Sequence, residues 1–288
     1  MSTLLRYAVC FVIGAGLLVP ACKKKGSQVD LKVVAGREDS NILPTSVGLA
    51  PLLDNVDWLD PVCTGAFVND HLLITAAHCV IQWRQDPNIA SIRIVSDTQT
   101  FKNRTVHSSQ YLLHPEYAAR NPELKSSDLP SLVAYDIGFI IFPPNTAPPS
   151  LIIRFASTPP VVGELVQLVG YGVNAATDFP ITDGTRRYGR NRIETIDSQH
   201  FDAITVRGVN DSNGATAQME KASIGQGDSG GPLYNEKGEV IGITSYRLWT
   251  YPSVGKAPTP ENNYTISGFA NILNPVTRAY IDEVMRTH

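Results

Sequence analysis

One string in the sequence combines the features that a nucleophilic serine needs. The segment from Gly227 to Pro232 reads Gly-Asp-Ser-Gly-Gly-Pro, with Ser229 at its centre. A serine nucleophile requires an exposed hydroxyl and nearby backbone N–H groups directed at the oxyanion that forms during attack on a carbonyl. Glycines on both sides permit the tight backbone that this geometry requires. An ordinary turn has the same composition, so the string alone does not exclude a purely structural role.

A histidine and an aspartate upstream have the residue types that would activate such a serine. His78 follows the apolar run 72–74 and stands among small residues, directly before Cys79. In isolation, a structural histidine with satisfied hydrogen bonds is the better interpretation. Asp136 stands at the start of the apolar run 137–142. Because burying an unpaired carboxylate is costly, we expect Asp136 to have a partner such as an imidazole N–H.

The elements that must position these residues are predicted to be β-strands. Short runs rich in β-branched and aromatic residues are separated by Gly, Pro, Asn and Asp, and no amphipathic helix pattern recurs between them. This texture predicts an all-β fold of sandwich or barrel type, with the proline-rich stretch 143–160 between two halves. The expected strands are Ala66–Thr75, Ser91–Ser96, Ile137–Phe142, Leu165–Val169, Ala203–Val206, Val240–Ser245 and Thr265–Ile272.

A helical pattern is found only at the C-terminus. Asn274 is a suitable N-cap and Pro275 suits the first helical position. The pattern predicts a helix over 274–287. Its expected apolar stripe comprises Val276, Tyr280, Ile281 and Val284.

Composition limits the classes of function. The 288 residues are 43% hydrophobic and 18% charged, which argues against wholesale disorder. A net charge of −3 is too close to neutral to suggest a nucleic-acid partner. The six histidines lack paired ligand spacing, so we expect no metal and no cofactor.

The first 21 residues have the pattern of a signal peptide. Arg6 precedes the uncharged apolar run 7–19, and small residues follow up to Ala21. The string ending at Cys22 resembles a bacterial lipoprotein signal, in which the cysteine is lipidated and becomes the new N-terminus. Ordinary cleavage after Ala21 is the alternative. We therefore expect an exported protein, either anchored to the bacterial cell envelope through Cys22 or secreted.

Two cysteines remain beyond the predicted signal, Cys63 and Cys79. An even pair in an exported domain predicts a disulfide, with two buried thiols as the alternative. The separation of 16 residues closes a loop that should stabilise the fold by about 3 kcal/mol.

The order of His78, Asp136 and Ser229, with their local strings, resembles the trypsin/chymotrypsin family of serine peptidases, as a bacterial exported member. Three further strings resemble that family, and the resemblance extends from Val33 to the C-terminal helix. They are Cys-Thr-Gly-Ala from Cys63, with Cys79 as the partner of Cys63; His-Pro-Glu-Tyr from His114; and Gly-Tyr-Gly from Gly170.

The resemblance implies a fold of two six-stranded antiparallel β-barrels with a C-terminal α-helix. The peptidase domain is then expected over 33–288, with barrel halves at about 33–150 and 151–273 and the helix at 274–287. A monomer that acts on protein or peptide substrates is expected. Two rival functions remain open: a catalytically silent homologue that serves as a binding module, and an esterase that uses the same site.

Catalytic roles are implied residue by residue. His78 would take the proton of Ser229 and later protonate the leaving amine, while Asp136 would orient His78 and stabilise its cation. The backbone N–H groups of Gly227 and Ser229 would form the oxyanion hole. The implied reaction is hydrolysis of a peptide bond through an acyl-enzyme.

The string that begins at Val33, directly after Lys32, is similar to the family's activation site. Cleavage after Lys32 would free an ammonium at Val33 that pairs with Asp228, so residues 22–32 would be a linker or propeptide of a zymogen. A surface strand that happens to follow a lysine is the alternative.

The substrate pocket departs from the family pattern. Ser223 stands at the pocket floor, where no carboxylate is available for a substrate lysine or arginine. Arg247 replaces a glycine and Gly225 replaces a cysteine. We expect cleavage after small or medium apolar residues, with selection of acidic residues by Arg247 as the alternative. The implied pocket residues are Ser223, Ile224, Ser245, Tyr246, Arg247 and Ser267; Ser245 would also bond Asp136 or be an ordinary strand residue.

Overall fold

The computed structural model describes the core of the protein and leaves several segments undescribed. The described residues are 37–38, 43, 45–53, 61–86, 89–98, 101–107, 110–120, 133, 135–172, 184–197, 203–209, 221–250, 259 and 263–288. The predicted signal peptide, Cys22, Lys32 and Val33 therefore lie outside the described residues.

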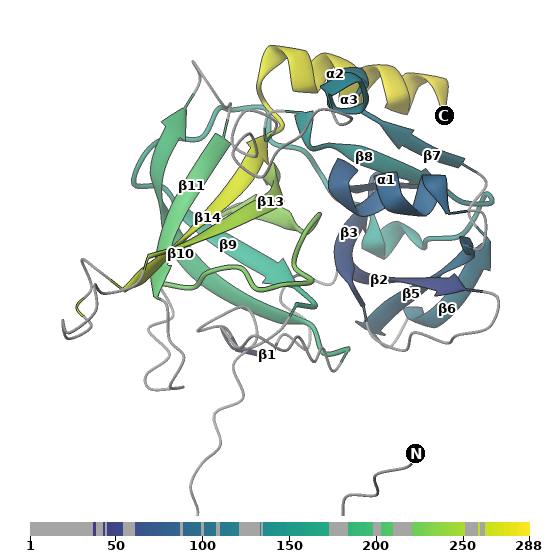
Figure 1. Ribbon diagram of the computed structural model, residues 1–288, viewed down its shortest axis with the longest axis horizontal. Helices are drawn as coiled ribbons and strands as arrows, with labels where there is room; N and C mark the ends of the chain where they lie inside the picture. The colour runs from purple at the N-terminus through teal and green to yellow at the C-terminus, as the bar shows by residue number, and fades with distance from the viewer. Residues whose placement is uncertain are drawn as a thin grey trace, which may run out of the picture.

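The first sheet is antiparallel, with strand order β6-β5-β2-β3-β4-β8-β7 (Figure 1). Its strands β6 and β7 stand at opposite ends of this order, although only residues 108 and 109 separate them along the chain. Strand β6 pairs with β5 and strand β7 pairs with β8, so two strands that are neighbours in the chain lie at the two ends of this barrel-like sheet. The strands are β2 Ser46–Leu53, β3 Cys63–Phe67, β4 Leu72–Thr75, β5 Ile89–Thr98, β6 Phe101–His107, β7 Gln110–Leu113 and β8 Gly138–Ile141.

The second sheet has the order β1-β10-β11-β14-β13-β12-β9, and an additional pairing of β9 with β10 closes six of its strands into a ring. The two-residue strand β1 is added outside that ring on β10. It belongs to this sheet although it precedes the first sheet along the chain. The strands are β1 Arg37–Glu38, β9 Leu165–Gly170, β10 Arg187–Asp197, β11 Ala203–Val209, β12 Pro232–Asn235, β13 Val240–Thr250 and β14 Tyr264–Asn271.

The predicted all-β architecture of two barrel-like antiparallel sheets with a C-terminal helix is thus confirmed. Two of its details were missed. The run 66–75 is a hairpin of β3 and β4 rather than one strand, because the polar residues 69–71 form the turn between them. The short helices α1 Ala77–Gln85 and α2 Pro115–Arg120 were not expected, nor was the 3₁₀-helix Pro149–Leu151.

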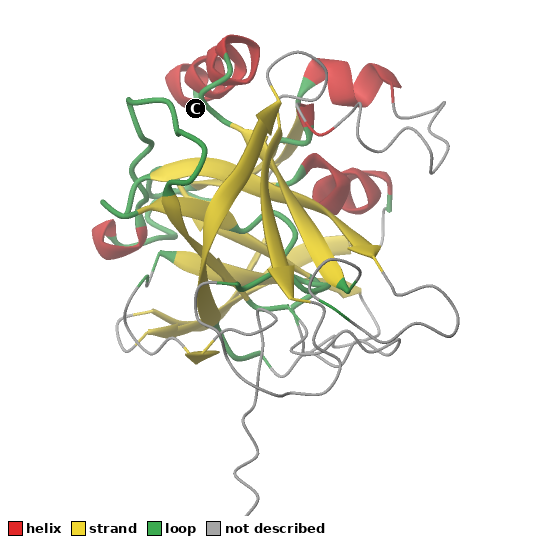
Figure 2. Cartoon of the chain, turned by 90° about the vertical axis from the view of Figure 1, so that its left-hand side faces the viewer, coloured by secondary structure: helices red, strands yellow, loops and turns green. Residues whose placement is uncertain are grey.

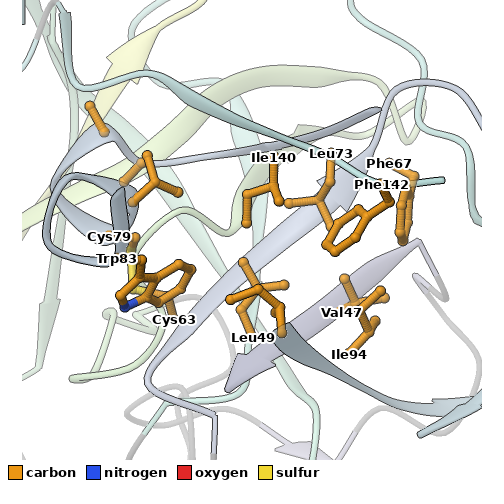
Figure 3. Close-up of a cluster of buried hydrophobic side chains, with 14 of the residues drawn as sticks. Val47, Leu49, Cys63, Phe67, Leu73, Cys79, Trp83, Ile94, Ile140 and Phe142 are labelled. Carbon is orange, nitrogen blue, oxygen red and sulfur yellow. A yellow bond between two sulfur atoms is a disulfide. The ribbon is translucent and has the colours of Figure 1, made fainter. Parts of the chain in front are cut away.

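Each barrel encloses its own apolar core. Figure 3 shows the core of the first barrel, where the disulfide between Cys63 and Cys79 lies beside Trp83 of α1. Buried residues on opposite walls of this barrel include Val47, Leu49, Phe67, Ile94 and Phe142. The second barrel is filled by another set, which includes Val166, Leu168, Ile204, Leu233 and Phe269.

A third apolar cluster joins the two barrels. Phe139 of β8 and Ile243 of β13 belong to it, together with Ile281 and Val284 of helix α3 Pro275–Thr287. Figure 2 turns the second sheet toward the viewer, with α3 lying above the strands. Because both sheets and α3 contribute to this cluster, it fixes the barrels relative to each other and so fixes any site on their boundary.

The C-terminal helix begins as predicted. The Asn274 Oδ1 atom accepts hydrogen bonds from the N–H groups of Val276 and Thr277 at 2.7 and 3.3 Å, and Pro275 occupies the first turn. One detail of the predicted stripe is wrong. Val276 is 53% exposed, whereas Thr277 is fully buried, because the helix turns this neighbouring position toward the barrels. No described helix is long and apolar enough to cross a membrane.

Candidate active site

His78 and Asp136 meet because the strands that carry them are neighbours. His78 is the second residue of α1, just after β4, and Asp136 lies two residues before β8. Strands β4 and β8 pair with Thr75 opposite Gly138, which brings both side chains to the same end of the sheet. The His78 Nδ1 and Asp136 Oδ2 atoms are 2.7 Å apart, and the His78 backbone N–H donates to Asp136 Oδ1 at 2.9 Å.

The Asp136 carboxylate is buried but fully satisfied. Its side chain is 5% exposed, and the Ser245 hydroxyl donates to its Oδ2 atom at 2.6 Å from strand β13 of the second barrel. Two donors from His78 and one from Ser245 offset the cost of burying this charge. The carboxylate therefore has a fixed position at the boundary of the barrels.

The electrostatics of His78 suit a base that becomes a cation. Burial of the imidazole is the largest single influence on its pKa and lowers it. The charge of Asp136 and the hydrogen bond to its carboxylate together outweigh that influence, so the His78 pKa is raised above its ordinary value. Because the His78 side chain keeps 35% of its surface exposed, a substrate can still reach it.

Ser229 lies in the turn before β12, and its backbone is held from several sides. The Thr64 N–H donates to the Ser229 carbonyl at 2.8 Å, and the Gly230 N–H donates to the Thr244 carbonyl at 2.8 Å. Gly227 and Gly230 have φ angles of 95° and 81°, which favour glycine at both positions. A Cβ atom on Gly230 would overlap the Thr75 hydroxyl. In the part of the chain that is described, the Ser229 hydroxyl forms no hydrogen bond.

Thr64 is a residue of this site that the sequence did not single out. Its hydroxyl donates to the Gly227 carbonyl at 2.9 Å, in addition to its N–H bond to Ser229. Both carbonyls are thus turned toward Thr64. Among the described residues, the N–H groups of Gly227 and Ser229 have no acceptor. The only sequence signal for Thr64 was its place in the Cys-Thr-Gly-Ala string.

The carboxylate of Asp228 lies beneath this turn. Its two oxygens accept from the N–H groups of Gly172 and Gly225 at 2.8 and 2.6 Å. Burial raises the pKa of Asp228 to about 6, although both hydrogen bonds and the charges of Arg247 and Arg187 act in the opposite direction. Lys32 and Val33 lie outside the described residues, so the pairing of Val33 with Asp228 stays a prediction.

Three of the expected pocket residues are linked by hydrogen bonds, and a fourth is buried next to them in the chain. Ser267 is fully buried, and its hydroxyl accepts from the Ile224 N–H at 3.1 Å. An Nη1 donor of Arg247 bonds the Ile224 carbonyl at 2.9 Å. Ser223 is fully buried beside them. Ser245 instead bonds Asp136, and the Tyr246 ring covers Gly268 so closely that a Cβ atom there would overlap it.

Among the described residues, one group of side chains brings together nitrogen and sulfur atoms of the kinds that bind metals. Atoms of Cys63, His78 and Cys79 lie within 4.8 Å of one another. The two sulfurs form a disulfide, so they offer no thiolate to a metal. The Cys79 sulfur also lies 3.7 Å from the Ser229 carbonyl, a packing contact because a disulfide sulfur has no proton to donate.

Comparisons with known proteins agree with this geometry. Mouse kallikrein-8 is 27% identical over 205 residues, which cover 69% of this chain and 70% of kallikrein-8. The structure of neuropsin, a serine protease of mouse brain, matches with a TM-score of 0.55 and 23% identity over 87% of this chain and 98% of neuropsin. Human heparin binding protein matches with a TM-score of 0.59 and 15% identity over 88% and 97%.

Because the solved structures are less than 25% identical in sequence, they show only that the fold is chymotrypsin-like. The family is shown by the match to a family profile. The profile of the Trypsin family matches residues 47–265, which is most of the chain. The chain therefore belongs to the trypsin family of serine endopeptidases.

Proposed function

We propose that His78, Asp136 and Ser229 form a catalytic triad that hydrolyses peptide bonds through an acyl-enzyme. His78 takes the proton of the Ser229 hydroxyl as its oxygen attacks the carbonyl carbon, then gives that proton to the leaving amine. Water, activated by the same imidazole, releases the acyl group and regenerates Ser229. Asp136 holds the Nδ1–H of His78 and stabilises the imidazolium formed during both steps.

The N–H groups of Gly227 and Ser229 are proposed to bind the oxyanion of the tetrahedral intermediate. Thr64 supports this role because it holds the carbonyls of both residues and leaves their N–H groups without acceptors among the described residues. Donors that are already oriented stabilise the developing charge without reorganisation during the reaction.

The observation that carries the proposal is the hydrogen-bonded chain from Ser245 through Asp136 to His78. A silent binding module would not require a buried carboxylate that orients a half-buried imidazole. The test is reaction of the purified enzyme with a fluorophosphonate probe, together with its activity on a peptide amide and on the matching ester. Labelling with amide hydrolysis supports the peptidase. Ester hydrolysis without amide hydrolysis would favour the esterase, and no labelling would favour the binding module.

We further propose that the enzyme prefers apolar over basic residues on the acyl side of the cleaved bond. Ser223 offers a substrate cation no negative charge, and the Arg247 guanidinium, held by Ile224, would repel it. Because an unpaired buried cation costs several kcal/mol, we expect kcat/KM for Lys and Arg to be about 100-fold below that for Leu or Val. A peptide library measures this. Dominance of Lys or Arg would contradict the proposal, and dominance of Asp or Glu that disappears in Arg247→Ala would identify Arg247 as the selector.

Release from the membrane and activation are proposed to be one event. If Cys22 carries a lipid, only residues 22–32 tether the domain, and cleavage after Lys32 cuts this tether. Cys63 and Cys79 are bonded to each other, so neither holds the propeptide. Strand β1 supports the activation step, because it begins at Arg37, only four residues after Val33. It pairs with β10, which pairs in turn with β9 at Gly170, where an added Cβ atom would overlap the Asp228 carboxylate.

We expect wild-type enzyme in cell fractions to be soluble and to begin at Val33. The Lys32→Gln variant should remain in the membrane fraction and be inactive, because it lacks the Val33 ammonium that pairs with Asp228. Lys25→Gln is the matched control, and it should be released like the wild type. N-terminal mass spectrometry and hydrolysis of a peptide substrate give both readouts. An active wild-type enzyme that still carries a lipidated Cys22 would contradict the proposal.

A further inference from the structure

Thr64 of β3 is fully buried, and each of its polar groups makes a hydrogen bond. Its N–H donates to the Ser229 carbonyl at 2.8 Å. Its own carbonyl accepts from the Thr75 hydroxyl at 2.8 Å. Its hydroxyl accepts from the Tyr171 N–H at 3.1 Å and donates to the Gly227 carbonyl at 2.9 Å. Because a hydroxyl has a single proton, this one is committed to Gly227.

The hydroxyl of Thr64 lies where three segments of the chain meet. Thr64 belongs to β3 of the first barrel, and Tyr171 directly follows β9 of the second barrel. Gly227 belongs to the turn before β12. The next residue after Tyr171 also holds this turn, because the Gly172 N–H donates to the Asp228 carboxylate at 2.8 Å. The end of β9 therefore fixes the turn at two points, one direct and one through the Thr64 hydroxyl.

Gly227 depends on this hydroxyl more than Ser229 does. The N–H of Ser229 shares a peptide group with the Asp228 carbonyl, which accepts from the Gly231 N–H at 2.9 Å. For the Gly227 carbonyl, the Thr64 hydroxyl is the one donor among the described residues. Gly227 has a φ angle of 95°, and a glycine rotates more freely than any other residue. Loss of the hydroxyl would therefore allow Gly227 to turn its N–H away from the site.

We propose that the Thr64 hydroxyl is a positioning group for the oxyanion site, because it ties Gly227 to the second barrel and keeps the Gly227 N–H directed at the oxyanion. Thr64 is buried and touches no substrate in this scheme. The oxyanion exists only in the tetrahedral state, so the hydroxyl acts on kcat and leaves the binding of the intact substrate unchanged. The inference rests on the proposed function, since it concerns the same site.

The test uses variants of the full-length chain that separate the hydroxyl from the shape of the side chain. Thr64→Ser keeps the hydroxyl. Thr64→Val keeps the shape but leaves the Gly227 carbonyl and the Tyr171 N–H without this partner. Thr64→Ala also removes the hydroxyl, and it replaces the valine variant if that one does not fold. Thr146→Val is the matched control, because the Thr146 side chain is also buried and its hydroxyl donates to the Pro143 carbonyl at 2.6 Å, away from the turn.

We expect Thr64→Val to lower kcat on a peptide amide about 30-fold, less than the roughly 10²- to 10³-fold lost when an oxyanion donor itself is removed. KM should stay unchanged. Thr64→Ser should keep most of the wild-type kcat, and Thr146→Val should keep all of it. Thermal midpoints of all variants are measured, so that the assays are run well below them.

An inhibitor pair reports on the oxyanion directly. With a peptide trifluoromethyl ketone, the Ser229 oxygen adds to the ketone carbon, His78 takes the proton and the ketone oxygen becomes the oxyanion. The Ki of this compound should rise in Thr64→Val by about the same factor as kcat falls, because both depend on the same donors. The Ki of the corresponding peptide alcohol, which forms no adduct, should not change.

The inference would be overturned by wild-type kcat in Thr64→Val and Thr64→Ala. Equal losses of affinity for the ketone and the alcohol, or an equal loss of kcat in Thr146→Val, would also overturn it, because they indicate general damage to the fold. Failure of the proposed function gives a different result. In that case the wild type itself would form no adduct with the trifluoromethyl ketone.

Discussion

Replacement of Ser229 by alanine is expected to lower kcat by about 10⁶-fold and to abolish fluorophosphonate labelling. The variant keeps the oxyanion donors and the substrate site, so only the residual catalysis of these groups should remain. Without the hydroxyl no acyl-enzyme can form, and His78 has no nucleophile to deprotonate. Steady-state hydrolysis of a peptide amide measures the loss.

The Ser229→Ala variant should remain folded, because the hydroxyl makes no hydrogen bond within the described part of the chain. The contact that fixes this residue uses its carbonyl, which accepts from the Thr64 N–H and is unchanged by the substitution. The thermal midpoint should therefore stay close to that of the wild type. Ser157→Ala, at an exposed loop position, is the matched control and should keep full activity. Undiminished hydrolysis by Ser229→Ala would exclude the proposed nucleophile.

Features that depend on local sequence could be predicted. The C-terminal helix starts at a capping asparagine followed by a proline, and both signals act within one turn. The strings around His78, Asp136 and Ser229 were informative for the same reason, because glycines and small residues indicate where the local backbone makes a tight turn or a close contact. Helix α1 was missed because its nine residues show no single apolar face.

Features that depend on distant partners could not be predicted. Thr64 bonds the Gly227 carbonyl across a separation of 163 residues. Nothing in the sequence around Thr64 predicts that contact. From the sequence, Arg187 would be taken for an ordinary polar residue of a strand. Its burial near Asp228 follows only from the register of β9 and β10. The orientation of Arg247 similarly depends on the Ile224 carbonyl, which belongs to another segment of the second barrel.

Replacement of Asp136 by asparagine is expected to lower kcat about 10⁴-fold. Asp136 accepts hydrogen bonds from the His78 N–H, the His78 Nδ1–H and the Ser245 hydroxyl. An asparagine at this position has one accepting oxygen, and its amide nitrogen must face a donor. The favourable response is for His78 to place its proton on Nε2, so that Nδ1 accepts from the amide. The Nε2 atom then carries a proton and cannot take another from Ser229.

The same substitution should move the acid limb of the pH profile. In the wild type, burial lowers the His78 pKa, but the charge and hydrogen bond of Asp136 outweigh burial and raise it. Asparagine removes the charge, so burial should dominate and the His78 pKa should fall. Because the base works only when neutral, the residual kcat/KM of Asp136→Asn should persist to lower pH than that of the wild type.

The chain contains a matched control for this experiment. Asp70 bonds the Nδ1 atom of His71 at 2.7 Å, the same distance as between Asp136 and His78. The other ring nitrogen of His71 lies 2.7 Å from the backbone oxygen of His288, the residue after α3, so this histidine is not placed to serve a nucleophile. Asp70→Asn should therefore leave kcat and the acid limb unchanged. The prediction would be contradicted if kcat of Asp136→Asn stayed within tenfold of the wild-type value, or if its acid limb did not move. Asp136 would then not be the residue that orients His78 and stabilises its cation.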